Sequence, residues 1–223
     1  MTIRGSTRKN NMAIAFENTV SAYTGSGTSV TVAHAAGASG RKAILVILST
    51  LATPTAVTVD GVAATAVRAT LFTVIAGSIY YFDSPPSGSV NYVATQAATD
   101  EIEIGVLIYS GMATGGADSS ADNIVVDTTL TVTTTVVASG CWLTGLSISS
   151  GSLPAAGTGT TVRTGATDTR IVGADSNATV GTGSQSLQFT TTPASAIRGV
   201  IASFTTGATV DTAKNLSLLG VGT

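Results

Sequence analysis

The sequence predicts an all-β protein, built as an antiparallel β-sandwich or jelly-roll-like domain with extended N- and C-terminal arms. Threonine, valine, serine, glycine and alanine dominate the composition; β-branched residues favour extended backbone, and glycine and serine favour turns. Strand-like runs return about every 8–15 residues, a spacing typical of sandwiches and barrels. No segment keeps a helical period. The 223 residues suffice for one large β domain or two small ones.

Three regions follow from the order of polar and apolar segments. Residues 1–11 are polar and basic and predict an exposed N-terminal arm. Residues 12–206 are expected to form the sandwich, with the part from about residue 113 as a second-half extension of it. Residues 207–223 predict a C-terminal tail. No shift in composition marks a boundary inside the middle region, and we expect no internal repeat of fixed period.

The first strands are predicted by alternation and by turn residues. Met12–Tyr23 reads as a strand, Thr24–Gly27 as a turn, and Ser29–His34 as the next strand. The apolar run Arg41–Thr50 predicts a strand covered on both faces. Asp60-Gly61 lies between two alternating segments, which is a strong β-hairpin signal.

The segment from Leu71 to Asp83 predicts two further strands, 71–75 and 78–83, with Gly77 between them as a turn or bulge. The stretch SIYYFDSPPSGSVNYVAT, residues 78–95, predicts a hairpin, because Pro85 and Pro86 cannot donate a ladder hydrogen bond.

Alternation continues to the end of the sandwich. Asp100–Gly111 alternates acids with isoleucine and then becomes apolar, which predicts a strand that begins at a solvated edge of the sheet and continues into the core. Met112–Asn123 predicts a loop. In the second half, similar runs are broken by glycine, and Ile197–Phe204 is expected to be the last core strand.

The residues that catalysis usually needs are scarce. The single cysteine, Cys141, excludes an internal disulfide, and beside Trp142 it predicts a buried small hydrophobe. The single histidine, His34, lies in an alanine-rich context. Glu101 and Glu103 are interpreted as solvated rim charges that deter edge pairing rather than as a catalytic pair. We therefore expect no enzyme, no catalytic residue and no cofactor.

Metal, nucleic-acid and membrane binding are also disfavoured. Asp118, Asp122 and the serines between them could supply oxygen ligands to Ca²⁺, but their spacing does not match an EF-hand, and a solvated loop is the favoured interpretation. The net charge is −2 and no basic patch is interleaved with aromatics. No apolar run has the length of a membrane span, and Met12–Phe16 is too short for the apolar part of a secretion signal.

A resemblance covers Arg41 to Met112. An apolar strand, the hairpin around VTVDGVAATAV, the turn Pro85-Pro86-Ser87-Gly88 and the ending Tyr109-Ser110-Gly111 follow one another in this order. This order resembles a β-sandwich module of phage structural proteins of the virion and decoration type, also seen in bacterial surface proteins. Met112 stands where that family often has valine. The resemblance implies a non-enzymatic structural role and transfers no catalytic residue.

These observations predict a phage capsid decoration or cement protein that bridges neighbouring capsid subunits. Its partners would be the major capsid protein lattice or other virion subunits. It would also form homo-oligomers and reside in virions assembled in the host cytoplasm. The residues expected to contact partners lie in the two arms: Arg4, Arg8, Lys9, Leu218, Leu219 and Val221.

A second function stays open. A carbohydrate-binding or receptor-binding sandwich module of a tail fibre or surface adhesin could use Tyr80, Tyr81 and Tyr92 as an aromatic platform. This hypothesis requires the three rings to form an exposed row. Aromatic packing between strands inside the sandwich is the favoured interpretation of the same residues.

Overall fold

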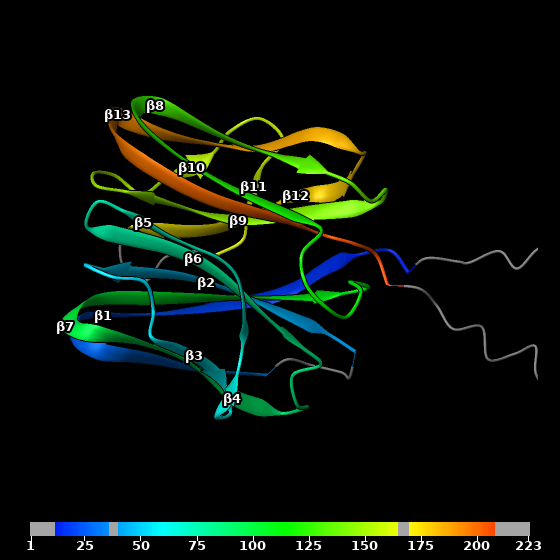
Figure 1. Cartoon of the computed structure of the whole chain (residues 1–223), viewed down its shortest axis with the longest axis horizontal. Helices are drawn as coiled ribbons and strands as arrows, with labels where there is room; N and C mark the ends of the chain where they lie inside the picture. The colour runs from blue at the N-terminus through cyan, green and yellow to red at the C-terminus, as the bar shows by residue number, and fades with distance from the viewer. Residues whose placement is uncertain (1–11, 36–39, 165–169, 208–223) are drawn as a thin grey trace, which may run out of the picture.

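The computed structural model describes residues 12–35, 40–164 and 170–207 (Figure 1). These residues form two antiparallel sheets that stack face to face, which confirms the predicted all-β sandwich. Within the described ranges, the chain has no helix long and apolar enough to cross a membrane.

Each sheet contains one half of the chain. The first sheet has the order β4-β3-β7-β2-β6-β5 with β1 paired to β7; its strands are β1 (Ala15–Ala35), β2 (Lys42–Thr50), β3 (Ala56–Val59), β4 (Val62–Ala63), β5 (Thr65–Phe72), β6 (Ile75–Asp83) and β7 (Ser89–Ser110). The second has the order β10-β13-β9-β12-β11 with β8 paired to β13; its strands are β8 (Ser119–Val136), β9 (Cys141–Ser149), β10 (Ala155–Ala156), β11 (Thr161–Val162), β12 (Ile171–Val180) and β13 (Gly183–Phe204).

The longest strands bend, so that each takes part in two layers. The second half of β7 pairs with β2 and its first half with β3, and one hydrophobic cluster contains residues of all three strands. In β8, the Asn123 side chain donates to the Thr131 carbonyl at 2.9 Å although the two residues are eight positions apart. A straight strand would separate them by roughly 27 Å. Figure 1 accordingly shows four layers, with β3 and β8 in the outermost ones.

Three hydrophobic clusters hold these layers together. A shared core fills the space between the two sheets, and each half of the chain has its own outer core. Strand β2 shows why its sequence is apolar throughout. Ile44, Val46 and Leu48 face the shared core, whereas Leu45 and Ile47 face the outer core of the first half.

The two sheets have the same topology. In the first, β1 pairs with β7, β7 with β2, β2 with β6 and β6 with β5, while β3 pairs with the first half of β7. In the second, β8, β13, β9, β12 and β11 pair in that same succession, and β10 pairs with the first half of β13. We call residues 12–110 unit 1, residues 119–207 unit 2 and residues 111–118 the linker. Among the described strands of unit 1, only β4 has no counterpart in the described part of unit 2.

Short sequence matches lie at equivalent places in the two units. Ala-Ser-Gly occurs at 38–40 and at 138–140, and both glycines take left-handed backbone, with φ of 76° and 74°. A buried proline follows β2 and β9, at Pro54 and Pro154. Matching segments lie at the start of β5, TAVR at 65–68, and around β11, TTVR at 160–163. The prediction that the chain has no internal repeat is therefore wrong. Matching residues are found at turns and strand ends, whereas the strand sequences between them differ.

The units also pack on each other reciprocally. Val46 and Leu146 are equivalent residues of β2 and β9. A Cβ added to Gly77 would lie 3.1 Å from Leu146, and one added to Gly173 would lie 3.2 Å from Val46. Each unit therefore places a glycine against the same position of the other, although the two glycines are not equivalent, because Ile79 is the counterpart of Gly173 in the register.

Several predicted elements need correction. Met12–Tyr23 and Ser29–His34 belong to one strand, β1, and the expected turn at Thr24–Gly27 is a pair of register shifts within it. The turn between β5 and β6 lies at Thr73, which has a φ of 65°. Gly77 instead lies inside β6. The Asp60-Gly61 hairpin is confirmed, since both residues have positive φ between β3 and β4.

Residues 78–95 do not form a hairpin. β6 pairs with β2 and β5, whereas β7 pairs with β1, β2 and β3, so the two strands on either side of Pro85 and Pro86 are not hydrogen-bonded neighbours. The two prolines end β6, and the chain then crosses from a central layer to an outer one. The turn signal was correct, but its partner strands were not.

Candidate functional site

One end of the molecule brings together the start of β1, the end of β13 and the linker. The Met12 amide donates to the Gly207 carbonyl at 3.1 Å, and the Gly207 amide donates to the Gly111 carbonyl at 2.7 Å. Gly111 has a φ of 73°, and an added Cβ would lie 2.1 Å from the Ala13 carbonyl oxygen, so only glycine fits there. We call this region the terminal pole. Both terminal segments are attached to it.

The arm residues predicted to contact partners lie outside the described residues: Arg4, Arg8, Lys9, Leu218, Leu219 and Val221. Their attachment points are nevertheless defined, because Met12 and Gly207 are adjacent. The first and last described residues, Met12 and Gly207, thus lie at the same end of the sandwich. The sequence alone could not show this neighbourhood, because it depends on how β1 and β13 are placed.

A buried lysine ties the linker to unit 1. Lys42 is 2% exposed, and its Nζ lies 2.5 Å from Asp83 Oδ1 and donates to the Gly115 carbonyl at 2.6 Å. The Gly115 amide donates back to Asp83 Oδ2 at 2.7 Å. Nζ also lies 4.3 Å from the centre of the Tyr81 ring. Burial lowers the pKa of Lys42, and the hydrogen bond and charge of Asp83 oppose this shift.

A second buried network joins the units on the opposite side of the shared core. Asp175 is fully buried and accepts hydrogen bonds from Tyr109 Oη at 2.9 Å and from Arg163 Nε at 2.8 Å. Burial, followed by the charge of Asp175, raises the pKa of Tyr109 well above its usual range. Each member satisfies another, so this network stabilises the fold and leaves little capacity for a reaction.

The three tyrosines of the alternative hypothesis do not form a row. Tyr92 is fully buried in the outer core of unit 1. Tyr80 and Tyr81 are half-buried and lie on opposite faces of β6, with Tyr80 against that outer core and Tyr81 against the shared core. No single exposed face therefore presents all three rings, and the geometry does not favour a sugar platform built from them.

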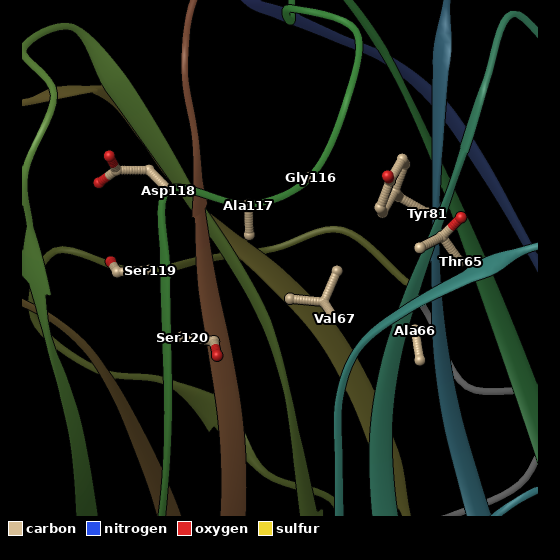
Figure 2. A pocket seen from close by; sticks show the side chains of 9 residues that line it. All are labelled: Thr65, Ala66, Val67, Tyr81, Gly116, Ala117, Asp118, Ser119 and Ser120. Carbon is tan, nitrogen blue, oxygen red and sulfur yellow. The ribbon is translucent and has the colours of Figure 1, made fainter.

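A solvent-open hollow of about 370 Å³ lies where β5 of unit 1 meets the start of β8 of unit 2. Figure 2 shows the side chains of Val67, Ala117 and Tyr81 converging on it, while the Asp118 carboxylate points away. Small side chains form most of its wall: Thr65, Ala66, Val67, Tyr81, Gly116, Ala117, Asp118, Ser119 and Ser120. No signal in the sequence indicated it, because its two walls come from different units.

The single histidine and cysteine have structural partners. His34 Nε2 lies 2.9 Å from Asn18 Oδ1, and burial lowers the pKa of the imidazole. Cys141 is buried, as its sequence context predicted. Its thiol donates to the Ala138 carbonyl at 3.2 Å. Burial and the charge of Asp118 raise the pKa of that thiol to about 11, which keeps it protonated at neutral pH.

The two aspartates considered as calcium ligands are engaged separately. The Asp118 carboxylate accepts hydrogen bonds from the backbone amides of Val137 and Ala138 at 2.8 and 3.1 Å. Asp122 forms an ion pair with Arg68. Among the described residues, no group of three or more His, Cys, Asp or Glu side chains is placed to hold a metal ion.

Glu101 and Glu103 are not rim charges. Both are buried, with exposed fractions of 8% and 0%, because β7 pairs with β1 on one side and β2 on the other. Arg170 Nη1 donates to Glu101 Oε2 at 2.8 Å. The interpretation as edge-protecting charges is wrong, since β7 is not an edge strand.

Compared with protein-family models, with curated protein sequences and with solved structures, the chain gives no match. The function must therefore be argued from the arrangement of its own residues.

Proposed function

We propose that this protein is a non-enzymatic structural component of a phage virion, most specifically a capsid decoration or cement protein that bridges neighbouring subunits. The terminal pole is the observation that carries the proposal. The two packed units place Met12 and Gly207, to which the terminal segments are attached, side by side. A single face of the block can then be held against a surface by two tethers of different chemistry.

The two terminal segments differ in chemistry, since one is basic and the other is apolar. The N-terminal segment carries Arg4, Arg8 and Lys9, and the C-terminal segment carries Leu218, Leu219 and Val221. Extended segments of these lengths would reach roughly 35–55 Å from the pole. One tether would pair with acidic patches and the other would bury apolar side chains on an adjacent subunit. A specific interface of standard size buries about 1,600 Å², and repetition over a lattice multiplies weak contacts.

The body of the protein supports a contact role. Only 10% of the residues are charged, and three buried charges, Lys42, Glu101 and Asp175, are paired within the fold. A surface with few charges packs against neighbouring proteins more readily than a surface with many like charges.

The proposal is tested by measuring how many copies bind per particle, using virions assembled without this protein and cosedimentation. Replacing Arg4, Arg8 and Lys9 with glutamine is expected to weaken binding about tenfold at 50 mM salt and less at 300 mM, because salt screens these charges. Leu218→Ser with Leu219→Ser is expected to weaken binding at both salt concentrations. Val126→Ser, which alters an 81% exposed valine of β8, serves as control. Full-length protein that binds no particle would refute the proposal.

A further inference from the structure

The repeat gives the hollow an internal counterpart. Two seams run along the edges where the sheets face each other: seam 1 between β5 and β8, and seam 2 between β11 and β1. The strand β5 begins with TAVR, and TTVR contains β11. Arg68 points across seam 1 to pair with Asp122, and Arg163 lies over Phe16 of β1 in seam 2. The two seams are therefore equivalent places built from equivalent strands.

Seam 2 is filled by an aromatic side chain. Phe16 lies opposite Tyr109 in the β1–β7 ladder, and their rings pack edge to face with centroids 5.7 Å apart. The guanidinium carbon of Arg163 lies 4.4 Å from the centre of the Phe16 ring. Phe16 thus closes seam 2 by stacking between the rest of the core and a cation.

In seam 1 the equivalent residue is Ala117. Tyr109 pairs with Lys42 at the start of β2, and Phe204 pairs with Trp142 at the start of β9, so Phe204 is the counterpart of Tyr109. Asn18 lies opposite Ile108, and Ser119 lies opposite Ser203, the counterpart of Ile108. Phe16 and Ala117 each stand two residues before these positions. A methyl group therefore stands where unit 1 has a phenyl ring, and the hollow of about 370 Å³ lies at this position.

We propose that the hollow binds an aromatic side chain carried by an extended segment of a partner polypeptide. The Tyr81 and Phe204 rings already pack edge to face beside it, with centroids 6.3 Å apart. Val67 and Ala117 add apolar wall, as Figure 2 shows. The volume lies at the small end of the range for ligand pockets, about 300–1,000 Å³. Aromatic anchors in such pockets are typical of interface hot spots.

Two observations indicate that the ring comes from another chain. The segments 1–11, 36–39, 165–169 and 208–223 contain no aromatic residue, so none of them can supply it. In the described part of the chain, β5 pairs only with β6, and β8 only with β13. Both walls of the hollow thus end in open strand edges, onto which an extended segment can add by backbone hydrogen bonds. This inference does not depend on the partner being a capsid protein.

The first test fills the hollow from within. Ala117→Phe is expected to raise the melting temperature by roughly 2–4 °C, because it supplies the ring that seam 2 already has. The matched variant Phe16→Ala is expected to lower the melting temperature, because it opens a hollow in seam 2. A lower melting temperature for Ala117→Phe would show that the hollow does not accept a ring and would overturn the proposal.

The second test uses the unaltered protein and three probes, followed by backbone amide chemical shifts in NMR. The peptide acetyl-Ser-Thr-Phe-Thr-Ser-amide is expected to shift the amides of Gly116 and Ala117 and of β5 at millimolar concentration. The same peptide with leucine in place of phenylalanine should bind at least tenfold more weakly, and Ala117→Phe should abolish the shifts. Equal binding of the leucine peptide, equal binding of free benzyl alcohol, or no shift with the phenylalanine peptide would each overturn the proposal.

Discussion

Units 1 and 2 use one equivalent arginine in two ways. Arg68 of β5 and Arg163, which follows β11, occupy equivalent places because they lie opposite the equivalent residues Ile79 and Gly173. Arg163 reaches a fully buried carboxylate, Asp175, and covers the ring of Phe16. Arg68 instead pairs with Asp122 on β8, where both side chains are partly exposed. The same backbone thus closes one seam with a buried network and leaves the other open.

The units also differ in which strand positions carry large side chains and which carry glycine. Leu45 of β2 corresponds to Gly145 of β9, and Ile79 of β6 corresponds to Gly173 of β12, because each pair occupies the same register in its sheet. A side chain in one unit is repeatedly matched by glycine in the other. The topology tolerates this exchange because each unit has its own outer core and packs it independently.

The largest difference is expected when the buried partner of Arg163 is removed. Asp175→Ala should lower the free energy of unfolding by about 3–5 kcal/mol, because it leaves the largely covered Arg163 guanidinium and the buried Tyr109 hydroxyl without their shared acceptor. Urea denaturation at pH 7 measures this change.

Asp122→Ala provides the matched control for that variant. It removes the partner of the equivalent arginine, Arg68, whose side chain is 38% exposed. The free energy of unfolding should therefore fall by less than about 1 kcal/mol. Equal losses for the two variants would mean that burial does not distinguish the seams.

The free energy of unfolding is expected to fall by about 3 kcal/mol when Gly145 of unit 2 is replaced by leucine, the residue of unit 1 at the equivalent position, Leu45. A Cβ added to Gly145 would lie 2.6 Å from the Val200 carbonyl oxygen, and backbone cannot move aside cheaply. Gly145→Leu should therefore lower the unfolding midpoint in urea. Gly181→Ala is the control, since its Cβ would meet no atom closer than 4.0 Å. A stable Gly145→Leu protein would show that the two units are interchangeable at this position.

The sequence was sufficient for the class of fold and for some of its local turns. The apolar run 42–50 correctly indicated a strand buried on both faces, and Asp60-Gly61 correctly indicated a hairpin. Neighbouring strands were harder, because pairing between β7 and β2 or between β13 and β9 is set by contacts far apart in the chain. The segment 78–95 shows the limit: its prolines fix where β6 ends but not which strand lies beside it.

The repeat escaped detection for a related reason. The residues that match lie at turns, such as Gly40 and Gly140, or at the seams, such as Arg68 and Arg163. At equivalent positions in the strands between them, one unit often has a large side chain where the other has glycine. The hollow could not be predicted either, because it depends on Ala117 standing where the other unit has Phe16. Only a comparison of the two registers reveals that equivalence.

The outer cores differ in their response to alkali. Tyr92 of unit 1 corresponds to Leu187 of unit 2, since they lie opposite Val32 and Val132. Burial, followed by the charge of Asp60, raises the pKa of Tyr92 to about 12, above its usual value of 10. The folded state therefore holds this proton more tightly than the unfolded state. The resulting stability is complete below pH 10 and is lost as the pH rises from 10 to 12.

Tyr92→Phe should remove this dependence on pH. Its hydroxyl has no hydrogen-bond partner among the described residues, so the variant should match the original protein at pH 7. Unfolding in urea, repeated at pH 7, 10 and 11.5, measures the difference between the two proteins. If the original protein loses no more stability than the variant above pH 10, then Tyr92 does not titrate as its burial requires.

The smallest effect is expected at Glu17, near the start of β1, which we compare with Asp118, just before β8. Glu17 pairs with Arg41 at 2.7 Å on the surface of unit 1, while its counterpart Asp118 accepts the amides of Val137 and Ala138 in unit 2. Glu17→Gln should change the free energy of unfolding by at most about 0.5 kcal/mol, because exposed ion pairs contribute little. Asp118→Ala should cost about 1–3 kcal/mol, because it removes the acceptor of two backbone amides. Thermal unfolding of both variants in parallel separates a surface charge from a structural cap, and a greater loss for Glu17→Gln would reverse that assignment.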